Sequence, residues 1–170
     1  MSTDAVIILL NGPINAGKTT VAREITALLP NTAHVEVDVL GEFVPFLSLA
    51  EAIPINLENA AAVTRNLVRR GFNVVLTYPL GQADHDELLA ALADLATPIH
   101  TVTLGPELAV ALSDRGGRPL SEHERWRIAE QYADGRHDPP FGIRIDNSTY
   151  TPNETAAKVL DHVRMRQEAD

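Results

Sequence analysis

The sequence predicts a three-layer α/β fold in which a five-stranded parallel sheet carries helices on both faces. Short apolar runs with strand character alternate with amphipathic helical segments along the 170 residues. The first of these runs ends in a glycine-rich turn that leads directly into a helical segment. Alternation of this kind is typical of parallel sheets, because each strand needs a crossover to reach the next one. A chain of this length fits one core, so we expect residues 1–170 to form a single domain.

The individual elements follow from periodicity and from their boundary residues. The expected strands are 5–10, 34–38, 72–78, 99–104 and 142–147. The expected helices are 18–29, 39–49 with a break at its proline, 56–70, 84–95, 107–113, one that begins near 122, and one that begins at 152. Ser121 and Glu124 form a capping-box pattern, and Thr151 followed by Pro152 is a typical helix start.

Composition excludes several classes of function. The formal net charge of −9 disfavours a nucleic-acid partner, because the phosphate backbone would be repelled. No cysteine is present, which excludes thiol chemistry. The apolar runs are too short to span a membrane, and the six histidines show no metal-binding pattern. We therefore expect a cytoplasmic protein without a membrane or nucleic-acid partner, and the oligomeric state stays open.

Residues 12–19 read G-P-I-N-A-G-K-T and match the pattern G-x-x-x-x-G-K-[ST], known as the P-loop or Walker A motif. Its glycines let the backbone N–H groups surround a phosphate, and the following helix adds the positive end of its dipole. Lys18 would reach the β- and γ-phosphates, and the Thr19 hydroxyl would bind Mg²⁺. The expected nucleotide-binding residues are Gly12, Pro13, Ile14, Asn15, Ala16, Gly17, Lys18, Thr19 and Thr20. The context of a strand before and a helix after the motif favours a P-loop NTPase fold over an ordinary turn.

Asp38 is the candidate catalytic base. It closes the stretch V-E-V-D at the end of the second predicted strand, and the carboxyl ends of parallel strands face the ligand crevice. A carboxylate there would accept a proton from an attacking hydroxyl or order water molecules around Mg²⁺. The alternative is that Asp38 caps a helix that starts at Val39. Glu36 shares the strand face of Asp38 by its period-two spacing.

Residues 114–121 predict a short lid over the phosphate site. Arg115 and Arg118 flank two glycines, so a flexible segment would carry positive charge toward the transferred phosphoryl group. The alternative is an ordinary solvated loop.

The sequence resembles the small-molecule kinase branch of P-loop proteins, which includes shikimate kinase, gluconate kinase and chloramphenicol phosphotransferase. The matching stretches are GPINAGKT, the V-E-V-D strand end, R-P-L at 118–120 and IDNSTYTPNETAAKVL at 145–160. The resemblance implies that Asp38 activates the substrate hydroxyl and that Arg118, and less directly Arg115, contacts the ATP phosphates. It also implies that the loop after the last strand lies against adenine through Asn147, Ser148, Thr151 and Pro152.

Thr77 and Tyr78 depart from these relatives, which often carry an Asp or a glycine pair at the end of the third strand. A conventional second carboxylate for Mg²⁺ is therefore missing there. The departure implies that Asp38 orders the metal's water molecules as well, and it disfavours shikimate as the acceptor.

Residues 39–70 are expected to hold the phosphoryl acceptor. Their apolar side chains suit a hydrophobic alcohol, although the same residues could equally belong to the core. They are Phe43, Val44, Phe46, Leu47, Leu49, Ile53, Ile55 and Leu57. The nearby arginines are Arg65, Arg69 and Arg70, which is a weak signal for a phosphate-bearing acceptor.

The sequence therefore predicts an ATP- and Mg²⁺-dependent phosphotransferase that acts on a hydroxyl of a metabolite or an antibiotic. The expected catalytic residues are Lys18, Asp38, Arg115 and Arg118, and the expected metal-binding residues are Thr19 and Asp38. Two alternatives remain open at this point, a nucleoside monophosphate kinase and an ATP-binding switch with slow hydrolysis.

Overall fold

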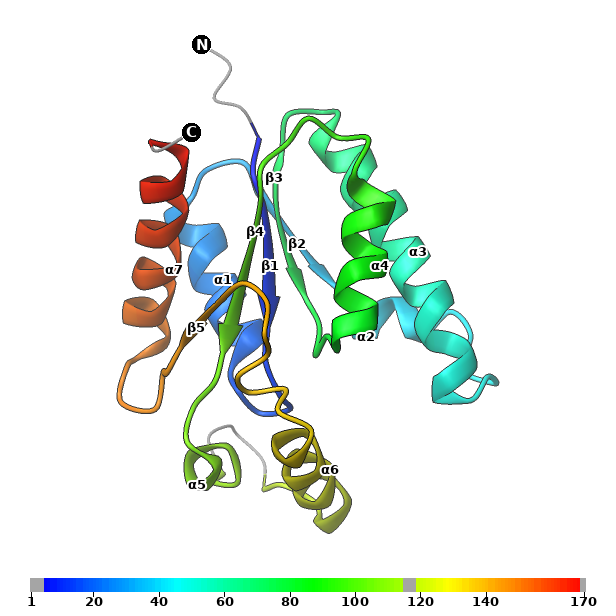
Figure 1. The fold of residues 1–170 in the computed structure, drawn as a ribbon, viewed down its shortest axis with the longest axis vertical. Coiled ribbons are helices and arrows are strands. Elements are labelled where there is room, and N and C mark those ends of the chain that lie inside the picture. The colour runs from blue at the N-terminus through cyan, green and yellow to red at the C-terminus, as the bar shows by residue number, and fades with distance from the viewer. Residues whose placement is uncertain (1–4, 115–118, 169–170) are drawn as a thin grey trace.

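The computed structural model describes residues 5–114 and 119–168 and contains the predicted parallel sheet (Figure 1). Its strands are β1 (Ile7–Asn11), β2 (Thr32–Glu36), β3 (Asn73–Thr77), β4 (Ile99–Leu104) and β5 (Ile143–Ile145). They pair in the order β2-β3-β1-β4-β5, and every pairing is parallel. The strands that follow β1 in the chain lie first on one side of it, as β2 and β3, and then on the other, as β4 and β5. The strand order therefore switches at β1, so the ligand crevice is expected at the carboxyl end of this strand.

Helices cover both faces of the sheet, which completes the three predicted layers. They are α1 (Lys18–Leu28), α2 (Val37–Gly41), α3 (Leu49–Val68), α4 (Gln82–Leu92), α5 (Leu108–Ala111), α6 (Glu122–Ala133) and α7 (Pro152–Gln167). In Figure 1, α1 and α7 lie on one side of the sheet and α3 and α4 on the other. The short α5 and the longer α6 lie beyond the carboxyl ends of the strands. No helix within the described part of the chain is both long and apolar enough to cross a membrane.

The central strand β1 is buried along its whole length. Ile8 and Leu10 point into the cluster formed with α1 and α7, and Ile7 and Leu9 point into the cluster formed with α3 and α4. This alternation follows from the period of two in a strand, and burial on both faces explains why the run reads as continuously apolar.

The second strand ends earlier than the sequence predicts. We expected a strand over 34–38, but β2 stops at Glu36 and α2 begins at Val37. The last strand pairing is Glu36 with Thr77, where β3 also ends, so no neighbouring strand is available to extend the ladder. Asp38 consequently lies in the first turn of a short helix.

The third helix begins earlier than predicted. A helix was expected over 56–70, but α3 starts at Leu49 behind a capping box between Ser48 and Glu51. Pro54 lies inside the helix, where it removes one backbone hydrogen bond and its ring crowds the carbonyl group four residues earlier. Buried Ala52, on the turn before this proline, helps to hold the early turns in place. The predicted capping box of α6 and the Thr151–Pro152 start of α7 are confirmed.

Asn11, the last residue of β1, links this strand to β4 and to the segment that contains Leu80. Its side chain is fully buried. The amide Nδ2 donates to the hydroxyl of Thr103 on β4 at 3.0 Å, and Oδ1 accepts from the backbone N–H of Leu80 at 2.8 Å. Both polar ends of the side chain are satisfied, so Asn11 anchors the start of the glycine-rich loop.

Replacing Asn11 with alanine is expected to lower the free energy of unfolding by about 2–3 kcal/mol, because the Leu80 N–H and the Thr103 hydroxyl lose a buried partner. Urea unfolding followed by circular dichroism measures this value. Asn66→Ala is the matched control on an exposed helix surface and should change stability by no more than about 0.5 kcal/mol. Equal effects of the two substitutions would contradict the anchoring role.

Candidate active site

The predicted P-loop forms the connection between β1 and α1. Gly12 has a φ of +144°, and a Cβ atom there would lie 2.4 Å from the carbonyl oxygen of Leu104. Gly17 has a φ of +95° and occupies the cap position immediately before Lys18. Both conformations favour glycine, which gives a physical reason for the two glycines of the motif. The loop therefore curls around the N-terminus of α1, where an anion is stabilised.

Contacts from distant parts of the chain hold this loop in position. The backbone N–H of Ile14 donates to Oε1 of Gln131 on α6 at 2.7 Å. On the other side, Nδ2 of the buried Asn147 donates to the carbonyl oxygen of Ala16 at 3.0 Å. The loop conformation thus depends on α6 and on the segment between β5 and α7.

Lys18 folds back across the loop. Its Nζ atom donates to the carbonyl oxygens of Gly12 and Pro13, each at 2.8 Å. An ammonium group has three donors, so one remains for another acceptor. Burial lowers the pKa of Lys18 to about 8, and the negative charges of Asp38 and Glu36 partly oppose this shift. The two carboxylates therefore lie close enough to the ammonium group to influence its charge.

Glu36 lies in the site, although the sequence analysis assigned it no chemical role. As the last residue of β2, it accepts a hydrogen bond from the Thr19 hydroxyl at 2.7 Å. The predicted metal-binding hydroxyl therefore has a carboxylate beside it. The available signal was the position of Glu36 in the V-E-V-D stretch, where only Asp38 was assigned a chemical role.

Asp38 does not cap a helix. The cap position of α2 is Glu36, and no side chain caps this helix. Burial raises the pKa of Asp38, the charge of Lys18 lowers it, and Glu36 and Arg127 act in opposite directions with smaller effects. The pKa of Tyr78 is raised to about 12 by burial and by the charges of Asp38 and Asp84, so the phenol keeps its proton at neutral pH.

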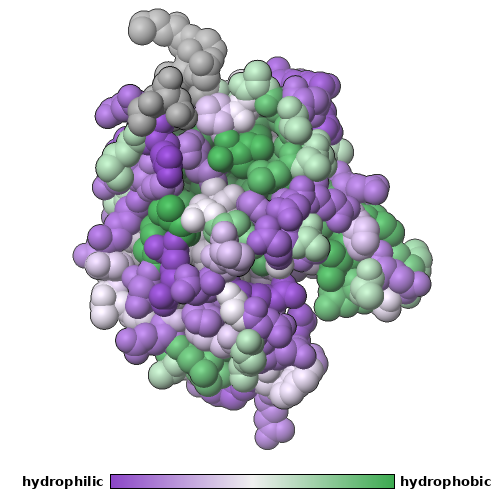
Figure 2. Space-filling model, in the orientation of Figure 1, coloured by the Kyte–Doolittle hydropathy of each residue, from purple (hydrophilic) through white to green (hydrophobic). Residues whose placement is uncertain are grey.

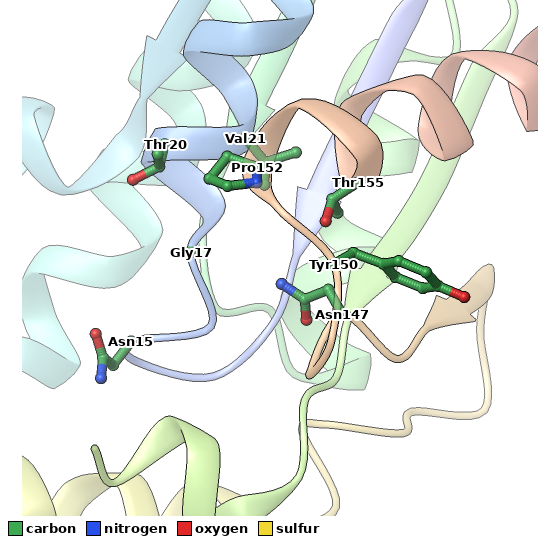
Figure 3. A pocket seen from close by; sticks show the side chains of 8 residues that line it. All are labelled: Asn15, Gly17, Thr20, Val21, Asn147, Tyr150, Pro152 and Thr155. Carbon is green, nitrogen blue, oxygen red and sulfur yellow. The ribbon is translucent and has the colours of Figure 1, made fainter. Parts of the chain in front are cut away.

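One cavity opens beside the P-loop and has a volume of about 150 Å³ (Figure 3). It is lined by Asn15, Gly17, Thr20, Val21, Asn147, Tyr150, Pro152 and Thr155. The structure therefore brings Asn147 and Pro152 to the loop as expected. Ser148 and Thr151 lie outside this lining: the Ser148 hydroxyl contacts Asp146, and Thr151 caps α7.

A second cavity of about 130 Å³ contains Asp38 and lies between α3, α4 and α6. It is lined by Asp38, Leu49, Ile53, Tyr78, Pro79, Asp84, Arg127, Glu130, Gln131, Asp134 and Arg136. The lining is mixed rather than predominantly apolar, which differs from the expected acceptor pocket. Periodicity did not reveal the contribution of α6, because this contribution depends on how the helix packs across the carboxyl end of the sheet.

Most of the apolar residues expected in the acceptor pocket lie elsewhere. Phe43 and Phe46 are 70% and 80% exposed, and Figure 2 shows hydrophobic surface on the projecting end of the molecule where α2 leads into α3. Leu57 belongs to the core. Among the expected residues, only Leu49 and Ile53 line the second cavity.

The two predicted lid arginines, Arg115 and Arg118, lie outside the described residues. The described ends of the predicted lid are tied together, because Asp114 accepts from Arg125 at 3.1 Å and from the backbone N–H of Leu120 at 3.0 Å.

Within residues 5–114 and 119–168, no group of three or more His, Asp or Glu side chains could hold a metal ion. Thr19 with Glu36 provides a hydroxyl and a carboxylate, the oxygen donors that Mg²⁺ prefers alongside phosphate oxygens. The site is therefore suited to a metal that is bound together with phosphates.

The sheet order and the glycine-rich loop define a P-loop fold, and two carboxylates lie near the lysine of this loop. The chain belongs to the family of chloramphenicol phosphotransferase-like proteins, whose profile matches residues 5–164. This match confirms the resemblance to small-molecule kinases. No curated protein matches the sequence.

Solved structures share the fold over almost the whole chain. The tunicamycin resistance protein of Deinococcus radiodurans is 21% identical, with a TM-score of 0.66, over 94% of this chain and 95% of that chain. The APS kinase of Mycobacterium tuberculosis, in complex with AMPPNP and APS, is 19% identical, with a TM-score of 0.66, over 95% and 98%. Shikimate kinase from Acinetobacter baumannii, in complex with shikimate, is 19% identical, with a TM-score of 0.63, over 97% and 96%. At these identities the similarity concerns the fold.

The lowered pKa of Lys18 can be measured directly, because the chain contains only two lysines, Lys18 and Lys158. In protein labelled with ¹³C at lysine Cε, one of two NMR signals should titrate with a midpoint of about 8. Lys18→Arg removes this signal and so assigns it. Asp38→Asn should lower the midpoint further, since a charge that raises the pKa is lost. A midpoint above about 10, close to that of a solvated lysine, would contradict the burial of this group.

Proposed function

We propose that the protein transfers the γ-phosphoryl group of ATP to a hydroxyl group of a small molecule. The observation that carries this proposal is a cavity lined by the P-loop together with a second cavity that contains Asp38, whose charge acts on the P-loop lysine. One cavity is lined by Gly17 and Thr20, and the other contains Asp38. A nucleotide bound in the first cavity would bring its phosphates to the P-loop, and the negative charge of Asp38 in the second cavity already raises the pKa of Lys18 on this loop.

In this proposal the nucleotide phosphates bind the backbone N–H groups of the P-loop and the ammonium group of Lys18. The base occupies the cavity between the P-loop and the start of α7, next to Asn147, Tyr150 and Pro152. The apolar face of a purine suits the ring of Tyr150 and the side chain of Pro152. Arg115 and Arg118 are proposed to contact the same phosphates.

The reaction would begin with the acceptor hydroxyl beside Asp38. Asp38 takes the hydroxyl proton while the oxygen forms a bond to the γ-phosphorus. The bond between this phosphorus and the oxygen that bridges it to the β-phosphate breaks, and ADP leaves. The raised pKa of Asp38 suits a general base, because a base acts best when its pKa lies nearer the working pH.

The residues that would hold Mg²⁺ are Thr19, as a direct ligand, and Glu36 and Asp38, through water molecules. When bound, Mg²⁺ neutralises charge on the β- and γ-phosphates. The hydrogen bond from Thr19 to Glu36 supports the inclusion of Glu36, which extends the assignment made from the sequence.

A nucleoside monophosphate kinase is the second candidate, and Arg127 and Arg136 in the second cavity are the observation that favours it. The three arginines considered from the sequence do not line this cavity: Arg65 and Arg69 pair with Asp94, and Arg70 donates to Asn66. An ATP-binding switch would differ from both enzymes in its response to acceptors. ADP formation from Mg·ATP, measured with chloramphenicol, hexoses, shikimate and nucleoside monophosphates, tests all three. A switch would show no stimulation by any acceptor.

Asp38→Asn is expected to reduce acceptor-dependent turnover by about 100-fold or more, because the general base is lost. Nucleotide affinity should stay within a few-fold. Steady-state ADP formation and calorimetric titration with Mg·ADP measure the two effects. Glu42→Gln, which removes a carboxylate from the exposed end of α2, is the matched control and should retain the turnover of the parent protein. Turnover close to normal in Asp38→Asn would remove this residue as the base.

Nucleotide affinity should also depend on the protonation of Lys18. Phosphate binding favours the ammonium form, so the Kd for Mg·ADP should rise about tenfold between pH 7 and pH 9 if free Lys18 has a pKa of about 8. The sign follows because proton uptake accompanies binding above this pKa. Lys18→Arg stays charged throughout this range, so its Kd should be nearly independent of pH. A Kd that varies equally in both proteins would assign the pH dependence to another group.

A further inference from the structure

Asn56 is a buried polar residue on the inner face of α3. Its side chain is only 5% exposed, and the residues one turn before and one turn after it on this face, Ala52 and Ala60, are also buried. The Oδ1 atom of Asn56 is closed to solvent and accepts no hydrogen bond within the described residues. A buried amide oxygen without a donor lowers the stability of a fold, so its presence on an apolar helix face needs a reason.

The contacts of α2 and α3 place this amide next to the second cavity. Asp38 of α2 and Ile53 of α3 line that cavity. Three residues further along each helix, Gly41 and Asn56 meet, because a Cβ atom at Gly41 would lie 2.9 Å from the Nδ2 atom of Asn56. Side chains on a helix lean toward its N-terminus, so the Asn56 side chain leans back toward the turn that contains Ile53. The interface of the two helices therefore leads from Asp38 to Asn56.

The packing around Asn56 does not itself require a polar side chain. Val37, Leu57 and Ala60 belong to the hydrophobic cluster on this side of the sheet. Leucine has the branched shape of asparagine and carries no polar atom, so it would fill a similar space without the unsatisfied oxygen. A polar side chain that lowers stability is typical of residues that serve binding rather than folding.

We infer that Asn56 is a specificity-determining residue that accepts a hydrogen bond, through Oδ1, from a second hydroxyl group of the phosphoryl acceptor. The inference rests on the proposed phosphotransferase function and narrows its substrate class to compounds with two or more hydroxyl groups. One hydroxyl reacts beside Asp38, and another donates to Asn56. One helical turn rises about 5 Å, so both hydroxyl groups can belong to one small molecule.

The contact with the acceptor requires a local movement, because the Oδ1 atom is closed to solvent. Rotation of the Asn56 side chain toward Ile53 would turn the amide to the cavity. A shift of α2 would uncover it as well, and this helix has only five residues and no side-chain cap. Either movement gives the buried oxygen a partner that it lacks in the free protein.

Asn56→Leu separates binding from folding. KM for the acceptor should rise about three- to tenfold with kcat nearly unchanged, because one neutral hydrogen bond to the substrate is lost. The acceptors are those among chloramphenicol, hexoses, shikimate and nucleoside monophosphates that stimulate ADP formation from Mg·ATP. The Kd for Mg·ADP should stay the same. The Tm should stay unchanged or rise by about 2–4 °C, since an unsatisfied polar atom leaves the core.

Matched acceptors identify the hydroxyl group that Asn56 holds. Glucose is compared with its monodeoxy analogues, and chloramphenicol with the analogue that lacks its secondary hydroxyl. In the parent protein, kcat/KM should fall about three- to tenfold for the analogue that lacks the held hydroxyl. For this analogue, Asn56→Leu should change kcat/KM by less than about twofold, because the contact is already absent.

Thr64→Val is the matched control on the same helix. Thr64 is fully buried, its Oγ1 atom also has no hydrogen-bond partner within the described residues, and it lines neither of the two cavities. The substitution removes an unsatisfied buried oxygen, as Asn56→Leu does. It should leave KM for every acceptor within about twofold of the parent value.

The two proposals fail in different ways. An acceptor KM that Asn56→Leu leaves unchanged would overturn the inference, whatever the change in Tm, and leave the phosphotransferase intact. Equal losses of kcat/KM in Asn56→Leu for an acceptor and all its deoxy analogues would do the same, as would an equal rise of KM in Thr64→Val. Absence of ADP formation above the rate with ATP alone, for every compound, would count against the phosphotransferase and therefore against both.

Discussion

The close approach of Gly12 to the carbonyl oxygen of Leu104 sets the path of the P-loop. A Cβ atom at this position would lie 2.4 Å from that oxygen, so only glycine allows β1 and β4 to stay paired while the chain turns away. Asn11 holds the preceding residue in place by its two buried hydrogen bonds. Because the chain leaves the sheet at a defined point, α1 begins at Lys18 and the loop amides surround its N-terminus.

This geometry places charges of opposite sign in a partly buried site. Burial lowers the pKa of Lys18 and raises that of Asp38, and each group opposes the shift of the other. Both pKa values therefore lie closer to neutrality than they would in water. A pKa nearer neutrality suits the role of general base proposed for Asp38, and an anion bound beside Lys18 would stabilise its ammonium form.

Much of the fold could be predicted from short-range patterns. The P-loop follows from residues 12–19, and the start of α6 follows from Ser121 and Glu124. The errors lie where tertiary contacts override a local signal. Asp38 was placed on a strand because its neighbours alternate, but β2 ends when its partner β3 ends. A helix was expected over 56–70, yet α3 begins at Leu49 with Ser48 as its cap and continues through Pro54.

The sequence by itself determined the order of elements, the parallel sheet and the position of the P-loop, because each depends on spacing and backbone conformation within a few residues. Only the tertiary structure decided which side chains surround Asp38. The second cavity takes Leu49 from α3, Asp84 from α4 and Glu130 from α6, and these residues are far apart in the chain. These residues come together because α3, α4 and α6 pack near the carboxyl ends of the strands. Local periodicity does not predict that packing.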